Sequence, residues 1–147
     1  MGRLIGIILI TCMCMTPFYA AAGDFDGSKP LMCVVKDSME CTRETGCEEV
    51  DEKDINMSAV LKVDFDEKKI RLISSDTGER VSEIENRKQI DGKLIVQGAE
   101  DGYKEYQDGN GWSMSIMESN GDMVLSASGD NVAFVLFGEC VPASYMN

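Results

Sequence analysis

Residues 112–140 read WSMSIMESNGDMVLSASGDNVAFVLFGEC, and this stretch indicates the fold class. Its first segment, Trp112–Met117, places apolar residues at alternate positions, which is the pattern of a strand with one buried face. Two turn sequences follow, Asn120-Gly121 and Gly129-Asp130-Asn131, and each leads into another apolar segment. Glycine and asparagine accept the backbone angles of tight hairpin turns. The stretch therefore predicts a three-stranded antiparallel meander.

The last segment of this meander, Val132–Phe137, is apolar at every position. A strand with two apolar faces needs neighbours that shield both of them from water. We therefore expect this segment to lie centrally in a sheet or to be covered on both sides.

Four segments upstream also have strand character. Leu61–Phe65 and Ile70–Ile73 alternate apolar and polar residues, and Leu31–Val35 is a short apolar run. Lys93–Gln97 follows Asp91-Gly92, which is a strong signal for a two-residue hairpin turn. These segments extend the strand pattern over most of the chain.

Three segments lack a clear strand pattern. Residues 79–89 fit helical spacing as well as a further hairpin, and we interpret them as strand. Residues 37–54 lose almost all apolar content and are expected to form an acidic loop held by a disulfide, and Gly98–Gly111 is expected to form a second loop. The chain thus predicts an all-β domain, a disulfide-stapled small antiparallel β-sandwich or meander barrel of seven to eight strands.

The N-terminal residues have the composition of a secretory signal peptide. Arg3 is followed by the apolar run Leu4–Ile10, and Ala20–Ala22 offers small residues for cleavage after Ala22. The apolar run is too short for a membrane anchor, and the residues before Cys12 and Cys14 do not suit lipidation. We expect a periplasmic or secreted protein that has no membrane association after cleavage. The expected organisation is a signal peptide at 1–22, a flexible arm at 23–30 and a single β domain at 31–147.

Charge and composition exclude several classes of function. The chain has 14 Lys+Arg and 26 Asp+Glu, so loss of Arg3 with the leader leaves 13 basic and 26 acidic residues, a net charge of −13. Such a domain is unsuited to nucleic acid, whose phosphates require basic residues. The absence of histidine excludes Ser-His-Asp and Cys-His catalysis and histidine-ligated metals. We expect no catalysis and no cofactor.

Four cysteines remain once the leader is removed: Cys33, Cys41, Cys47 and Cys140. An even number of cysteines in an exported domain predicts two disulfides, for which three pairings are possible. The short polar segment between Cys41 and Cys47 contains Gly46 and favours a local bridge, which leaves Cys33 to pair with Cys140. The spacing lacks a Cys-x-x-Cys motif and therefore disfavours a metal site.

Two segments begin like calcium-binding loops, Asp24–Ser28 and Asp108–Gly111. An EF-hand loop ends on an acidic residue at its twelfth position, but that position is Val35 for the first segment and Ser119 for the second. We therefore assign no metal site.

The first candidate for a binding surface is the expected loop Gly98–Gly111, because loops on a rigid β scaffold often carry binding residues. Its aromatic and charged side chains would form a recognition surface together with the tryptophan that follows the loop. Trp112 itself fits stacking on a ligand, but an aromatic at the edge of the core is the favoured interpretation. The candidate binding residues are Tyr103, Lys104, Tyr106, Asp108 and Trp112.

The layout of the chain resembles uncharacterised small exported β-proteins of alphaproteobacteria with a four-cysteine pattern. The resemblance rests on the leader, Cys33, the Cys41-x5-Cys47 pair, the Gly-Trp-Ser-Met-Ser-Ile strand that ends at Ile116, and Val-Leu-Phe-Gly-Glu-Cys ending at Cys140. It covers nearly all of the mature chain and implies no particular activity.

A weaker resemblance is to periplasmic inhibitors of C-type lysozyme, which are small exported β-barrels with a cysteine near each end. These inhibitors insert a loop with a serine and a basic residue into the lysozyme cleft. The nearest segments here are Ser126–Asp130, which has an acidic residue in place of the basic one, and Gly98–Lys104, which lacks the serine. A net charge of −13 would favour encounter with a basic enzyme.

These observations lead to an expected function and two alternatives. We expect an exported, non-catalytic binding domain whose partner is a basic protein or an envelope component. One alternative is an inhibitor of a cationic enzyme such as C-type lysozyme, and another is a calcium or small-ligand carrier. The oligomeric state does not follow from the sequence.

Overall fold

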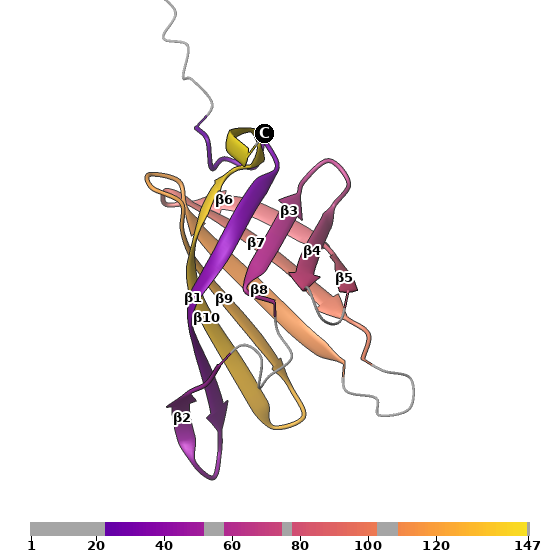
Figure 1. The fold of residues 1–147 in the computed structure, drawn as a ribbon, viewed down its shortest axis with the longest axis vertical. Helices are drawn as coiled ribbons and strands as arrows, with labels where there is room; N and C mark the ends of the chain where they lie inside the picture. Colours follow the sequence, from indigo (N-terminus) through magenta and orange to yellow (C-terminus); the bar gives the residue numbers. More distant parts are fainter. Residues whose placement is uncertain (1–22, 52–57, 75–77, 103–108, 147) are drawn as a thin grey trace, which may run out of the picture.

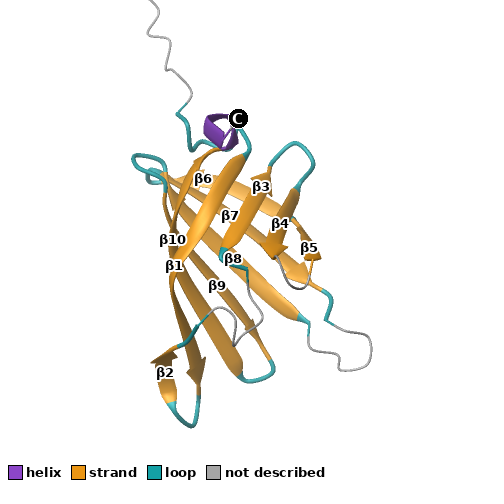
Figure 2. Ribbon diagram, in the orientation of Figure 1, coloured by secondary structure: helices purple, strands orange, loops and turns teal. Residues whose placement is uncertain are grey.

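The computed structural model describes residues 23–51, 58–74, 78–102 and 109–146. In this part of the chain, the backbone forms one antiparallel sheet that curls into a half-barrel (Figure 1). Figure 2 shows that strands dominate the fold. The predicted all-β class is confirmed, but the described residues form ten strands rather than seven or eight, and one curled sheet takes the place of the expected sandwich or meander barrel.

The strands are β1 (Leu31–Thr42), β2 (Gly46–Glu49), β3 (Val60–Asp64), β4 (Lys69–Ser74), β5 (Gly78–Glu83), β6 (Asn86–Ile90), β7 (Lys93–Glu100), β8 (Asn110–Met117), β9 (Asp122–Gly129) and β10 (Val132–Pro142), followed by the short 3-10 helix η1 (Ala143–Met146). Their order across the sheet is β5-β4-β3-β1-β10-β9-β8-β7-β6, and β2 pairs with β1 alone. Within the described residues, no helix has the length and apolar character needed to cross a bilayer.

The two longest strands, β1 and β10, pair along their whole length at the middle of the sheet. The all-apolar segment that begins β10 therefore lies centrally, as its sequence predicted. A bulge at Lys36 interrupts the pairing, since Val35 is opposite Gly138 and Asp37 is opposite Phe137. A Cβ at Gly138 would lie 2.2 Å from the carbonyl oxygen of Val34, so only glycine allows the strands to approach this closely beside the bulge.

The core lies on the concave side of the curled sheet and follows the period-two pattern of the strands. Two hairpin turns also form as predicted. Asp91 and Gly92 have φ angles of 48° and 71°, and Asp130 and Asn131 have φ angles of 46° and 66°. Both pairs fit the two-residue turns that suit the twist of antiparallel strands. The fully buried aliphatic side chains are Leu31, Leu61, Val63, Leu94, Val96, Met114, Ile116, Met123 and Leu136.

Three expectations about loops and strands are now resolved. The ambiguous residues 79–89 are strand, in β5 and β6, except for Ile84 and Glu85, which lie between the two strands. The expected acidic loop at 37–54 is wrong over its first part, because β1 runs to Thr42 and β2 follows it. The expected loop Gly98–Gly111 is also too long, because β7 ends at Glu100 and β8 begins at Asn110. In the two segments expected to be loops, the neighbouring strand supplies hydrogen bonds to backbone whose side chains are mostly polar, so side-chain hydrophobicity underestimates the strand length.

Both disulfides join residues that are directly opposite each other on paired strands. Cys33–Cys140 lies in the core and connects β1 to β10 through two cysteines that are 107 residues apart in the sequence. Cys41–Cys47 connects β1 to β2 across six residues. This is the pairing that the spacing of the cysteines favoured.

Residues 23–30, expected to be a flexible arm, lie against one end of the sheet. Phe25 packs on the core, and the Arg87 guanidinium donates a hydrogen bond of 2.8 Å to the carbonyl of Gly27. The Ala143 amide donates to the carbonyl of Pro30 at 2.9 Å, which ties this segment to the C-terminal residues. The segment therefore covers the end of the half-barrel at which β1 begins (Figure 1).

Removal of the long disulfide should destabilise the protein more than removal of the short one. The entropy of the unfolded chain rises with the length of the loop that is released, so Cys33→Ala/Cys140→Ala should lower the free energy of unfolding by about 5 kcal/mol and Cys41→Ala/Cys47→Ala by about 2 kcal/mol. Urea denaturation of both variants, followed by circular dichroism, measures this difference. Equal losses would contradict the central role of the β1–β10 bridge.

The N-terminal segment should loosen in acid. Asp24 binds Lys29 at 2.8 Å, and this ammonium lowers the pKa of the Asp24 carboxyl, as the Ser28 hydrogen bonds lower the pKa of Asp26. A carboxyl whose pKa is lowered in the folded state stabilises that state at pH values above its ordinary pKa. This contribution is lost as the pH falls through the lowered pKa. Asp24→Asn should therefore cause a small loss in melting temperature at neutral pH that disappears once the pH falls below the lowered pKa of this carboxyl. A difference that persists in strong acid would rule out the carboxylate as its cause.

Candidate functional site

The candidate site is the end of the sheet opposite the segment 23–30. Because the strands are antiparallel, the end of β1 at Thr42, the start of β10 at Val132 and the end of β7 at Glu100 meet at this end. In Figure 1 it is the lower end, where β2 and the β9–β10 turn lie. Two features occupy it, an acidic hairpin on one side and a contact between β5 and β7 on the other.

The acidic hairpin consists of residues 37–51, which include the second half of β1 and all of β2. Every residue of β2 is exposed. Arg43 is the only basic residue of the hairpin, so residues 37–51 carry a net negative charge. Its acidic residues are Asp37, Glu40, Glu44, Glu48, Glu49 and Asp51.

Two of these acidic residues oppose each other directly. Glu40 on β1 pairs with Glu48 on β2. Like charges at opposed positions of an antiparallel pair destabilise it. The arrangement therefore costs stability locally, and other interactions must hold the hairpin together.

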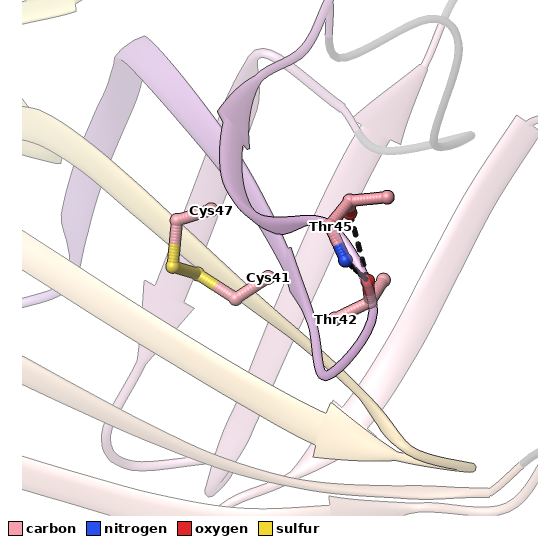
Figure 3. Close-up of a disulfide and its surroundings, with 4 residues drawn as sticks. All are labelled: Cys41, Thr42, Thr45 and Cys47. Atoms are coloured by element: carbon pink, nitrogen blue, oxygen red, sulfur yellow. Dashed lines mark hydrogen bonds between the residues drawn. A yellow bond between two sulfur atoms is a disulfide. The ribbon is translucent and has the colours of Figure 1, made fainter.

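Covalent and polar contacts hold the hairpin in place (Figure 3). The Cys41–Cys47 disulfide joins its strands, and Gly46 adopts a φ of 84° at the turn. The hydroxyl oxygens of Thr42 and Thr45 lie 2.8 Å apart, and the Thr45 amide donates to the Thr42 hydroxyl at 3.1 Å. The turn is thus closed from two sides despite the repulsion between its glutamates.

A row of paired residues crosses the sheet from the hairpin to the far strand. The register places Glu48 beside Glu40, and then continues through Phe134, Ala127 and Trp112 to Gly98. The row ends where β7 approaches β5.

Trp112 is buried at this approach of β5 and β7. Its side chain is 8% exposed, and its indole Nε1 donates a hydrogen bond of 2.7 Å to the hydroxyl of Ser82. The Ser82 hydroxyl also lies 3.3 Å from the carbonyl of Ala99 on β7. The ring is therefore a part of the core that links β8 to β5, and it offers no exposed face for stacking on a ligand.

Gly98 allows β5 to lie against β7. A Cβ at this position would be 2.2 Å from the carbonyl oxygen of Glu83 and 2.5 Å from Cζ2 of Trp112. Such distances are far inside van der Waals contact, so any larger residue would push the two strands apart. Beyond Gly98, the Arg80 guanidinium on β5 forms an ion pair with Glu100 on β7, with Nε at 3.0 Å from Oε1.

A polar hollow lies beside this ion pair. Its volume is about 560 Å³, and it is lined by Arg80, Val81, Ser82, Glu83, Glu85, Ala99, Glu100, Asp101 and Gly102. Arg80 is the single basic residue in this lining, and its charge is already paired with Glu100. The hollow is consequently unsuited to an anionic ligand.

Of the binding residues that the sequence suggested, the structure describes Trp112. Trp112 lies in β8 and is buried, whereas Tyr103, Lys104, Tyr106 and Asp108 lie outside the described residues. The hairpin acids were visible in the sequence only as a charged run. Their assembly into a two-stranded surface depends on the extension of β1, for which the apolar pattern carried no signal.

The suggested calcium segment Asp24–Ser28 has its acidic groups engaged elsewhere. Asp24 binds Lys29, and the Asp26 carboxylate accepts a hydrogen bond of 2.8 Å from the Ser28 amide. Over residues 23–51, 58–74, 78–102 and 109–146, no three acidic, cysteine or histidine side chains gather in a group that could hold a metal ion.

The two segments considered for a lysozyme-inhibiting loop lie partly in strands, and Tyr103 and Lys104 of the second are outside the described residues. Ser126–Gly129 belongs to β9, and Asp130 lies in the two-residue turn that follows. Gly98–Glu100 belongs to β7.

No family model, curated protein or solved structure matches the chain.

Substitution of Gly98 should disrupt the contact between β5 and β7. Gly98→Ala should lower the free energy of unfolding by about 2 kcal/mol or more, because the new methyl group overlaps backbone that cannot move independently. Gly111→Ala is the matched control, since its Cβ would have no atom within 4 Å. Fluorescence of Trp112, the single tryptophan, reports both unfolding and exposure at this contact. Equal stability of the two variants would show that the contact is not tight in solution.

Proposed function

We propose that this protein is an exported, non-catalytic binding domain that uses the acidic hairpin to contact a basic protein. The carrying observation is that a two-stranded hairpin, closed by a disulfide, carries six acidic residues and one basic residue, and five of the six acids are exposed. A surface of one charge attracts a partner of the opposite charge over several ångströms and accelerates encounter.

The energetic cost of the hairpin supports a binding role. The opposed Glu40–Glu48 pair lowers the stability of the strands on which it lies. Replacement of either side chain by a neutral one would relieve the repulsion without loss of a buried contact, because Glu48 is exposed and Glu40 is only half-buried. A basic partner would neutralise both carboxylates, and relief of their repulsion would then contribute to the free energy of binding.

The shape of the surface favours binding over catalysis. Acid catalysis by paired carboxyls needs one group in a desolvated site beside the substrate. The acids of β2 are exposed instead, on a strand at the edge of the sheet. Two disulfides also suit the oxidising periplasm or extracellular space that the leader sequence predicts.

Removal of hairpin charges should weaken binding to a basic protein. A C-type lysozyme serves as the basic probe, and titration calorimetry at low and physiological salt measures the affinity. Glu44→Gln/Glu48→Gln should weaken binding by about three- to tenfold at low salt and by less at high salt, because exposed charges are screened. A parallel assay of cell-wall lysis shows whether the bound enzyme is also inhibited.

The matched control is Asp66→Asn/Asp91→Asn, which removes the same charge from turns at the opposite end of the sheet. This variant should bind nearly as well as the original protein. Equal losses from both variants would mean that net charge alone drives the interaction. If neither variant changes the affinity, the acidic hairpin is not the binding surface and an uncharged envelope component becomes the better candidate.

A further inference from the structure

The outer edge of β2 differs from the other strand edges of the sheet. At one end of the strand order, β5 lies against β7 through Ser82 and the Arg80–Glu100 ion pair. At the other end, β6 pairs with β7 alone and its residues are exposed, but its charged residues, Arg87 and Lys88, are basic and would repel a basic segment. No strand among the described residues pairs with the outer side of β2.

The hydrogen-bond pattern shows which groups of β2 point outward. The Val50 amide donates to the carbonyl of Ser38 at 3.0 Å, so these two residues form a hydrogen-bonded pair. Such pairs alternate with pairs whose backbone groups face away from each other. In the register of β1 and β2, the outward groups are therefore the N–H and C=O of Cys47 and of Glu49.

The Cys41–Cys47 disulfide fixes this orientation. It connects two residues of a non-hydrogen-bonded pair, with Cα atoms 4.0 Å apart. A one-residue slip of β2 would invert the inward and outward groups, and the covalent bond prevents that slip. The edge is consequently preorganised, which lowers the entropy cost of adding another strand.

The charges around the edge select what can be added. Natural proteins place charges on edge strands to prevent pairing with another copy of the same strand. Here Glu48, Glu49 and Asp51 would repel a second β2, so this edge opposes self-association. The same carboxylates would attract lysine or arginine side chains on an incoming strand.

We propose that an extended, basic segment of a partner protein adds as a strand to the outer edge of β2. The proposal rests on the proposed binding function and specifies its mode. Backbone hydrogen bonds to Cys47 and Glu49 hold the segment, and its basic side chains meet the glutamates of the hairpin. Because β2 has four residues, the partner segment needs only a short extended stretch of similar length.

Two substitutions at one position separate backbone bonding from charge. Glu49→Ala and Glu49→Pro both remove the carboxylate, but only proline also removes the outward N–H. Glu49 is in a non-hydrogen-bonded pair with Met39, so the change removes no hydrogen bond to β1. The probe is an octapeptide of alternating lysine and valine, with a glutamate–valine octapeptide as the charge control.

Proline should weaken binding of the lysine–valine peptide by about tenfold more than alanine does, as expected for the loss of backbone hydrogen bonding at this position.

Hydrogen exchange on the unsubstituted protein provides a measurement that does not depend on the folding of a variant. Peptide binding should slow exchange of the Cys47 and Glu49 amides and leave the Glu48 amide nearly unchanged, because Glu48 already faces β1.

The outcomes distinguish this proposal from the proposed function. If proline and alanine weaken binding equally and the two amides gain no protection, strand addition is wrong, while charge-based binding stands if Glu44→Gln/Glu48→Gln still weakens it. Loss of any effect from that charge variant would overturn both proposals. Equal binding of the glutamate–valine peptide would overturn the selection for a basic segment.

Discussion

The structure depends on the pairing of β1 with β10. These strands begin and end the described sheet in sequence, yet they lie side by side at its centre and are joined through the buried Cys33–Cys140 bridge. The paired residues are 90 to 111 positions apart, and contacts over such separations cost chain entropy. The disulfide removes much of this cost, because it restricts the unfolded state. The flanking hairpins can then add on either side through local turns.

The bulge at Lys36 connects this central pairing to the candidate site. Before the bulge, the free edge of β1 pairs with β3, and beyond it the same edge pairs with β2. The extra residue changes which backbone groups of β1 face that edge. The pairing of β2 therefore depends on the bulge at Lys36. Gly138 permits the bulge because the Val34 carbonyl occupies the space of a side chain. The acidic hairpin is thus a continuation of the central strand.

Much of the fold could be predicted because the physics is local. Alternation in 112–117, the turn at Asp91-Gly92 and the apolar segment at the start of β10 all gave correct assignments. The assignments failed where strands carry polar residues, as in 37–42, 46–49 and 98–100, because the pairing of those residues depends on backbone groups of distant strands. The candidate site lies in such a region, and Trp112, suggested as a binding residue, is held in the core by Ser82, a residue 30 positions away.

The sequence by itself determined the all-β class, the acidic charge, the absence of histidine chemistry and the two-disulfide framework. These properties follow from composition, local periodicity and spacing. Only the tertiary structure decided that the sheet has one curled layer, that Glu40 opposes Glu48 and that β2 presents Cys47 and Glu49 at an edge. The reason is physical: register and edge position arise from hydrogen bonds between segments far apart in the chain, and side-chain patterns do not encode those bonds.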